Sequence, residues 1–230
     1  MRIVLLLLAM HFLLLAELSF ADENVLTSKE KSEGWVLLFD GKSTEGWMDS
    51  QENLAGQEHV QDGCLNPHPC AYMLIRKEVY DHFKLSLEFK ISKGCNSGVF
   101  VRTFPLQPRP GKDVGFNGIE IAIDDTTTAG FHDTGAIYDL VKPSKNVMKP
   151  QGEWNRMVVT CDRALIQVEL NDLETTRINL DEWTKPNLRP DGSEHKFDVA
   201  YKEHPRQGYI GLQDHGSDIW YRNIKLLPLK

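Results

Sequence analysis

Apolar and polar residues alternate along this chain in short runs that turn residues separate. In FKLSLEFKI (83–91) every second residue is apolar, which is typical of a β-strand with one buried face. Seven other runs are short, rich in β-branched and aromatic residues, and bounded by Gly, Pro, Asn or Asp. They are WVLLF (35–39), GVFVR (98–102), GIEIAID (118–124), NRMVVTC (155–161), LIQVEL (165–170), GYIGLQ (208–213) and IWYRNIKLL (219–227). Because helix signals are poor, we predict an all-β fold, a two-sheet antiparallel β-sandwich of the jelly-roll type.

Three of these strands separate an apolar face from a face that carries polar chemistry. The apolar faces contain alternating Ile, Val and Leu residues, which are expected to meet the second sheet. The opposite faces consist of Glu120, Ala122 and Asp124; Phe100 and Arg102; and Gly211, Gln213 and His215. Solvated strand faces are usually polar, so an ordinary surface is one interpretation. Phe, Arg, Gln and His rarely serve solvation alone, and glycines beside these strands permit close approach of a ligand. A shared binding face is the other interpretation.

The N-terminus predicts export. Arg2 precedes an apolar run that is too short to span a bilayer comfortably, and Ser19-Phe20-Ala21 has the small-x-small form of a cleavage site. We predict a signal peptide over 1–21, with a membrane anchor as the alternative, and a polar, loose linker over 22–33. The mature protein would be secreted or periplasmic, with no membrane association after cleavage. The remaining residues, 34–230, suit one domain.

The net charge limits the possible partners, and the cysteines raise the question of disulfides or a metal site. The formal net charge is −7 and the basic residues are scattered, which argues against a nucleic-acid partner. Four cysteines, Cys64, Cys70, Cys95 and Cys161, allow three disulfide pairings in an oxidising compartment. The pair within CLNPHPC (64–70) is the first choice. A metal site of His59, Cys64, His68 and Cys70, with no standard zinc spacing, and free thiols are the alternatives.

Six segments together resemble one protein family. They are GWVLLFDGKSTEGW, NSGVFVR, GIEIAIDD, TGAIYDL, GEWNRMVV and GYIGLQDHGSDIWYRNIKL, and they cover nearly all of 34–230 in the family's order. The chain is identified on these segments as resembling the DUF1080 family, also called the 3-keto-disaccharide hydrolase domain. This resemblance implies a concanavalin A-like jelly roll, and a carbohydrate as the ligand.

The resemblance also implies the chemistry, because characterised members act on glycosides with a ketone at C3. The ketone acidifies the C2 hydrogen, so a base can remove it, the C1 group can leave by β-elimination, and water can add back. Such a site needs a base, an acid and a donor for the enolate oxygen, a role that a divalent metal could also fill. A sugar C3 dehydrogenase is the implied partner, because another enzyme must make the ketone.

Candidate residues for each role come from the polar faces. Glu120 and His215 are the predicted acid/base pair, because burial can tune Glu upward and His titrates near neutral pH. Arg102 is the predicted donor to an oxyanion, or else it pairs with Asp124 or Glu120. Asn96 and Gln213 are predicted to contact sugar hydroxyls. Phe100 or Trp154 is predicted to stack on a pyranose ring, and Asp124 is a candidate metal ligand.

Two alternatives stay open. Relatives often carry Gln where this chain has Ala122. The loss of that amide could remove a sugar or metal contact, or it could mark a subgroup with a different substrate. A non-catalytic carbohydrate-binding module needs aromatics and amides but no tuned acid/base pair, and fold does not determine function. A classical retaining glycosidase would show Glu-x-Asp-x-Glu on one strand, where this chain has Glu120, Ala122 and Asp124.

Overall fold

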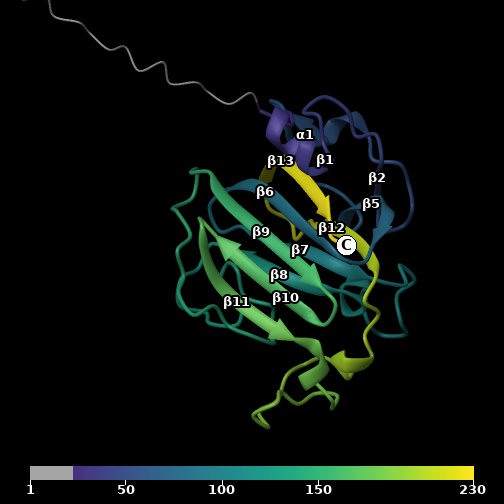
Figure 1. Ribbon diagram of the computed structural model, residues 1–230, viewed down its shortest axis with the longest axis vertical. Coiled ribbons are helices and arrows are strands. Elements are labelled where there is room, and N and C mark those ends of the chain that lie inside the picture. Colours follow the sequence, from purple (N-terminus) through teal and green to yellow (C-terminus); the bar gives the residue numbers. More distant parts are fainter. Residues whose placement is uncertain (1–22) are drawn as a thin grey trace, which may run out of the picture.

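The computed structural model describes residues 23–230, which form two antiparallel β-sheets packed face to face (Figure 1). Sheet A has the strand order β11-β10-β9-β6-β13-β4-β3, with β1 also paired to β13. Sheet B has the order β2-β5-β12-β7-β8. The predicted all-β, two-sheet sandwich of the jelly-roll type is confirmed.

The elements are short, as the sequence pattern indicated. Sheet A contains β1 (Val36–Leu37), β3 (Val60–Gln61), β4 (Cys64–Leu65), β6 (Phe83–Ile91), β9 (Asn155–Asp162), β10 (Leu165–Leu170), β11 (Leu173–Asn179) and β13 (Ile219–Pro228). Sheet B contains β2 (Trp47–Asp49), β5 (Met73–Tyr80), β7 (Asn96–Thr103), β8 (Ile119–Asp124) and β12 (Gly208–Gln213). The helices are α1 (Ser28–Glu33), η1 (Gln57–His59), η2 (Val114–Asn117), η3 (Leu180–Glu182) and η4 (Tyr201–Glu203).

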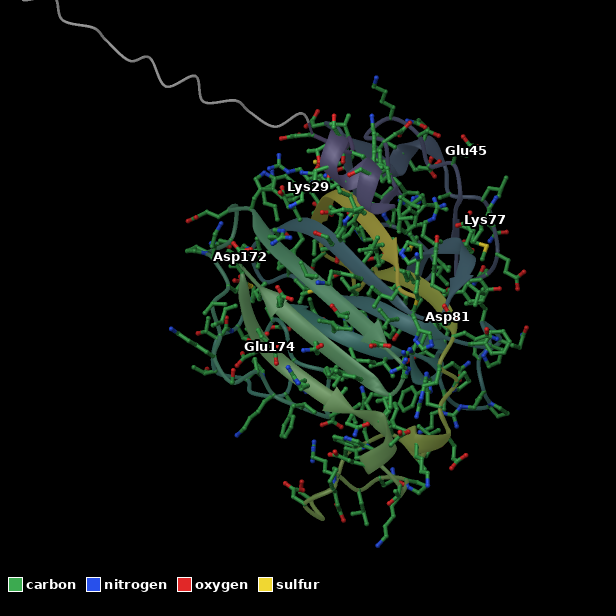
Figure 2. The ribbon with its side chains drawn as sticks, in the orientation of Figure 1. Lys29, Glu45, Lys77, Asp81, Asp172 and Glu174 are labelled. Carbon is green, nitrogen blue, oxygen red and sulfur yellow. The ribbon has the colours of Figure 1, made fainter. Side chains whose placement is uncertain are left out.

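All eight predicted strands are present, and the strands that were not predicted have compositions that hide them. β5 reads MLIRKEVY, in which Met, Leu, Arg, Lys and Glu are good helix formers and three charged residues in a row interrupt the alternation. β11 reads LETTRIN and forms the edge of sheet A. Figure 2 shows Glu174 of this strand and the neighbouring Asp172 at the rim of the sheet. An edge strand that faces water needs few apolar residues, so its alternation is weak.

The apolar faces of both sheets form one core, as the alternation predicted. Ile121 and Ile123 of β8, Val99 of β7 and Leu212 of β12 are buried in it. Trp47 is also buried there and donates its indole N–H to the carbonyl of Leu38 at 3.0 Å. The face of sheet B that points away from this core is therefore the face to search for a site.

The segment expected to be a loose linker is packed onto the domain. Asn24 is buried and exchanges two hydrogen bonds with Asn223, at 2.7 and 2.8 Å. Thr27 caps α1, and Glu30 forms an ion pair with Lys225 at 2.8 Å. The linker prediction is wrong for residues 23–33, because paired amides and a capped helix tie them down. The predicted signal peptide lies outside the described residues. No helix within 23–230 is long and apolar enough to cross a membrane.

All four cysteines are free thiols, so the predicted Cys64–Cys70 disulfide is wrong. Cys64 belongs to β4, and its thiol faces the carbonyl of Asp62, whereas the backbone of Cys70 is held by the carboxylate of Asp214 at 2.7 Å. Burial raises the pKa of the Cys70 thiol to about 12, which keeps it protonated at neutral pH.

The alternative zinc set is not assembled either. His59 is bonded to the backbone carbonyl of Asn66, and His68 to the Asp214 carboxylate, both at 2.9 Å. These contacts occupy one ring nitrogen of each histidine, and the contact of His68 joins the loop after β4 to the loop after β12.

Candidate active site

The outward face of sheet B brings most of the predicted site residues onto two neighbouring strands. Asn96, Gly98 and Phe100 of β7 pair with Asp124, Ala122 and Glu120 of β8, respectively. Paired residues of antiparallel strands project to the same side, so these side chains share one face. The face predicted from alternation is confirmed for β8 and for Phe100 of β7.

Glu120 lies on this face, and its carboxyl has a strongly raised pKa. Its side chain is only partly exposed, and burial raises the pKa of its carboxyl to about 8; Lys196 opposes this rise and Asp113 adds to it. Gly98 makes the position possible, since a Cβ there would lie 2.8 Å from the Cγ of Glu120. A carboxyl that titrates near neutral pH suits proton transfer.

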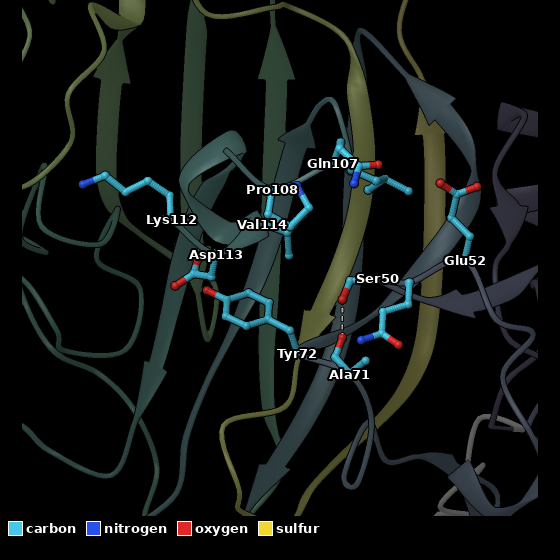
Figure 3. Close-up of a pocket in the computed structure, with 11 residues that line it drawn as sticks. Ser50, Glu52, Ala71, Tyr72, Gln107, Pro108, Lys112, Asp113 and Val114 are labelled. Carbon is cyan, nitrogen blue, oxygen red and sulfur yellow. Dashed lines mark hydrogen bonds between the residues drawn. The ribbon is translucent and has the colours of Figure 1, made fainter. Parts of the chain in front are cut away.

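Tyr72 packs against Phe100, the strand partner of Glu120, and the sequence pattern did not indicate it. Its φ of +70° is a left-handed conformation that is rare for an aromatic residue and is found at functional sites. Burial, helped by Asp113 and Glu120, raises the pKa of its hydroxyl well above the usual value, and Gln213 is a further polar neighbour. Figure 3 shows the hydroxyl next to Asp113.

The space for this hydroxyl is built into η2. A Cβ on Gly115 would lie 2.1 Å from the Tyr72 hydroxyl oxygen, so only glycine fits with the ring in place. Asp113 caps η2 by accepting the N–H of Gly115 at 2.9 Å, which fixes its carboxylate on the same side. No local sequence pattern announces a tyrosine with positive φ, so this residue could be found only in the fold.

A lysine held by aromatic rings supplies positive charge near Glu120. The ammonium of Lys196 lies 4.0 Å from the ring centroid of Tyr138, 5.4 Å from that of Phe116 and 5.2 Å from that of Phe197. Tyr138 also donates its backbone N–H to the carbonyl of Glu120 at 2.9 Å. Cation–π contacts therefore hold an exposed cation where it favours the ionised form of Glu120.

The second predicted acid/base residue, His215, lies on an exposed loop after β12. Its neighbour Asp214 shapes the loop by accepting hydrogen bonds from the backbone N–H groups of Cys70 and Gly216, at 2.7 and 2.8 Å. Gln213, at the end of β12, is buried beside Tyr72, and its side-chain oxygen has no hydrogen-bond partner among residues 23–230. The role of His215 stays a prediction.

Comparison with known proteins identifies the family. The family described as the 3-keto-alpha-glucoside-1,2-lyase-like domain matches residues 34–227. The chain belongs to this family. The resemblance predicted from the sequence motifs is therefore confirmed.

Three relatives of this lyase-like family member are informative. A protein of Bacteroides thetaiotaomicron named 3-keto-disaccharide hydrolase is 25% identical, over 92% of this chain and 84% of that protein. A crystal structure from Parabacteroides distasonis, titled "putative glycosyl hydrolase", is 32% identical with a TM-score of 0.70, over 85% of this chain and 99% of the other. A second structure with a similar title from that organism has a TM-score of 0.73 at 24% identity, over 91% of this chain and 100% of the other.

Arg102 is not on the outward face of this lyase-like domain, which corrects the sequence prediction. Tyr209 pairs with Thr103 and Gly211 with Phe100, so one residue lies between these pairs on β12 but two on β7. Arg102 is part of this bulge, with φ of +55°, and is fully buried. Its charge acts on the buried thiol of Cys161 in sheet A. An extra residue reverses the alternation, so Arg102 points to the core and cannot contact a substrate on the outward face.

The buried guanidinium of Arg102 predicts an unusual stability result. None of its three nitrogens has a hydrogen-bond partner among residues 23–230, and burial lowers its pKa. Because an unpaired buried charge is costly, Arg102→Met is expected to leave the free energy of unfolding unchanged or raise it by about 1–3 kcal/mol. Urea denaturation measures this difference.

Arg222 provides the matched control for that prediction. It bonds to Glu88 at 2.7 Å and also to Glu23, so Arg222→Met should lower the free energy of unfolding by leaving Glu88 without its partner. A loss for Arg102→Met as large as that for Arg222→Met would show that Arg102 has stabilising partners.

The two predicted stacking residues are both unavailable to a substrate near Glu120. Trp154 precedes β9 and packs in sheet A between Arg222, 3.9 Å from its ring centroid, and Lys90, 5.1 Å away. It therefore lies across the sandwich from Glu120. Phe100 is on the expected face but fully buried, with the ring of Tyr72 edge-on at 6.0 Å and Leu106 in the same apolar cluster. It forms the floor of the site and not an open stacking platform.

The predicted metal ligand, Asp124, lacks companions. No group of three or more His, Cys, Asp or Glu side chains within residues 23–230 is arranged to hold a metal ion. The backbone N–H of Asp124 bonds to Thr134 at 3.0 Å, and its strand partner is Asn96. This donor set does not fit a divalent cation.

Proposed function

We propose that the protein cleaves the glycosidic bond of 3-keto-glycosides by elimination followed by hydration, as a hydrolase or lyase of glycosyl bonds. The observation that carries this proposal is Glu120, a carboxyl whose pKa is raised to about 8 on the outward face of sheet B. The family description and the name of the Bacteroides relative support the substrate class.

The reaction needs one base and one acid. Ionised Glu120 takes the C2 hydrogen, and the freed electron pair forms a C2–C3 double bond with negative charge on the C3 oxygen. The C3 carbonyl then re-forms as the C1–C2 double bond forms and the C1–oxygen bond breaks, with a proton passing to the leaving oxygen. Water adds across C1–C2, placing hydroxyl on C1 and hydrogen on C2, so the net change is hydrolysis without oxidation or reduction.

The neighbours of Glu120 fit the remaining roles. Tyr72 keeps its proton at neutral pH because its pKa is raised, and it can give that proton to the basic leaving oxygen. The ammonium of Lys196 can stabilise the enolate charge from its position over Tyr138. His215, on the exposed loop after β12, remains a second predicted acid/base group.

The pH dependence of turnover tests the role of Glu120. Below pH 8 most of the carboxyl is protonated, so kcat/KM should rise about tenfold per pH unit up to about pH 8 and then level off. The measurement is release of sugar from a 3-keto-glycoside between pH 6 and 9, with and without EDTA. A rate that falls through pH 8 would make Glu120 the acid. Binding without product at any pH would favour a carbohydrate-binding module.

We further propose that the protein is exported, so that sequencing of the mature N-terminus would begin at Asp22 after cleavage of 1–21.

The chemistry requires a ketone at C3 before the glycosidic bond is cleaved. An oxidation by a sugar C3 dehydrogenase must therefore supply the substrate, in the same compartment or upstream of it.

A further inference from the structure

A pocket of about 500 Å³ lies beside Tyr72, between the turn at residues 50–52 and the loop at 106–114 (Figure 3). Its two walls differ in character. The turn side is polar and consists of Ser50, Gln51 and Glu52. The loop side has an apolar part, Leu106, Pro108 and Val114, and a polar part, Gln107, Lys112 and Asp113.

The polar wall is built by a turn with its own hydrogen bonds. Asp49 accepts the backbone N–H groups of Gln51 at 2.8 Å and Asn53 at 3.0 Å, and Glu52 has a left-handed φ of +67°. The hydroxyl of Ser50 donates to the carbonyl of Ala71, immediately before Tyr72 (Figure 3). The wall and Tyr72 are therefore held together.

Tyr72 and Asp113 connect the pocket to the catalytic carboxyl. Both line the pocket, and the ring of Tyr72 packs edge-on against Phe100, the strand partner of Glu120, with 6.0 Å between the ring centroids. Asp113 also raises the pKa of Glu120. A substrate with its C2 hydrogen over Glu120 would extend its C1 substituent past the Tyr72 hydroxyl into this pocket.

We propose that this pocket is the leaving-group subsite and that it binds a neutral pyranose, the second sugar of a 3-keto-disaccharide. A pyranose has apolar C–H faces and hydroxyl edges, which match the apolar part of the loop side and the polar groups around it. The carboxylates of Glu52 and Asp113 can accept hydrogen bonds from sugar hydroxyls but would repel an anionic leaving group. Lys112 also lines the pocket, but its ammonium makes a cation–π contact with Phe116, 4.5 Å from the ring centroid.

The proposal rests on the proposed function and is tested by comparing two substrates. Gln51 is exposed, so Gln51→Trp should fill the pocket without disturbing the fold. For this variant, the ratio of kcat/KM for a 3-keto-diglucoside to that for methyl 3-keto-α-glucoside should fall about tenfold or more. Gln207→Trp, at another exposed position before β12, should leave both values unchanged. An unchanged ratio for Gln51→Trp would overturn the subsite.

Binding separates this proposal from the proposed function. If the wild type cleaves neither substrate, the proposed function fails, and calorimetry still judges the subsite. Gln51→Trp should then weaken binding of the 3-keto-diglucoside about tenfold relative to the wild type, and Gln207→Trp should not. Equal binding by both variants would overturn the subsite. A diglycoside whose leaving sugar is a uronic acid should bind about tenfold more weakly, and tighter binding would overturn the assignment to a neutral sugar.

Discussion

Replacing Glu120 with glutamine is expected to lower kcat for a 3-keto-glycoside by about a thousandfold, because the amide cannot accept the C2 proton. The substitution preserves size, so the side chain should still lie across Gly98 and the substrate should still bind. Steady-state turnover of a 3-keto-glycoside measures the loss, and calorimetry measures binding. Turnover within about threefold of the wild type would remove Glu120 from the mechanism.

The same variant has a second, independent signature in stability. The pKa of Glu120 is about 8 in the fold and 4.5 in its ordinary state, so between these values the folded chain binds more protons than the unfolded chain. Stability of the wild type should therefore fall as pH rises from about 4.5 to 8, and this contribution is absent in Glu120→Gln. The melting temperature of the variant relative to the wild type should rise over that range. A constant difference would mean that the carboxyl is not buried as described.

His215→Ala is the comparison that separates the two predicted acid/base residues. His215 is exposed, so its loss should have little effect on stability. A loss of turnover comparable to that of Glu120→Gln would place His215 in the reaction, and unchanged turnover would leave Glu120 and Tyr72 as the proton-transfer pair.

The face that carries Glu120 could be predicted because strand alternation depends only on local pattern. Glu120, Asn96 and Asp124 lie where the period of two placed them. Arg102 does not, because one bulged residue reverses the alternation beyond it, and the bulge arises from the pairing with β12. The prediction for Trp154 was wrong for a different reason, because this residue flanks a strand whose sheet could not be assigned from sequence.

The remainder of the candidate site depends on segments without periodicity. The turn at 49–53 and the loop at 104–118 bring Tyr72, Asp113 and the pocket together through capping bonds and glycine contacts. Such contacts join residues that are distant in the chain, so no short window of sequence contains them. The absence of a Cys64–Cys70 disulfide could not be predicted for the same reason, because contacts with distant residues hold the two cysteines in separate environments.

Removal of the Tyr72 hydroxyl is expected to lower kcat about a hundredfold with little change in KM, because Tyr72→Phe leaves the leaving oxygen without its proton donor. The backbone and the edge-on contact with Phe100 need not change, since only the hydroxyl is lost. Turnover of a 3-keto-glycoside measures the effect. The loss should be smaller for a substrate whose leaving group is a phenol, because a phenolate departs without protonation.

Two companion variants decide whether that loss reflects proton donation. Tyr209→Phe removes the hydroxyl of a tyrosine that packs on the same apolar cluster, and it should leave turnover unchanged. Gly115→Ala keeps the Tyr72 hydroxyl but inserts a methyl group 2.1 Å from its oxygen, so it should displace the hydroxyl and reproduce much of the loss. Equal losses for phenolic and sugar leaving groups in Tyr72→Phe would contradict the acid role. If those losses are equal and Gly115→Ala has normal turnover, Tyr72 only lines the site and donates no proton.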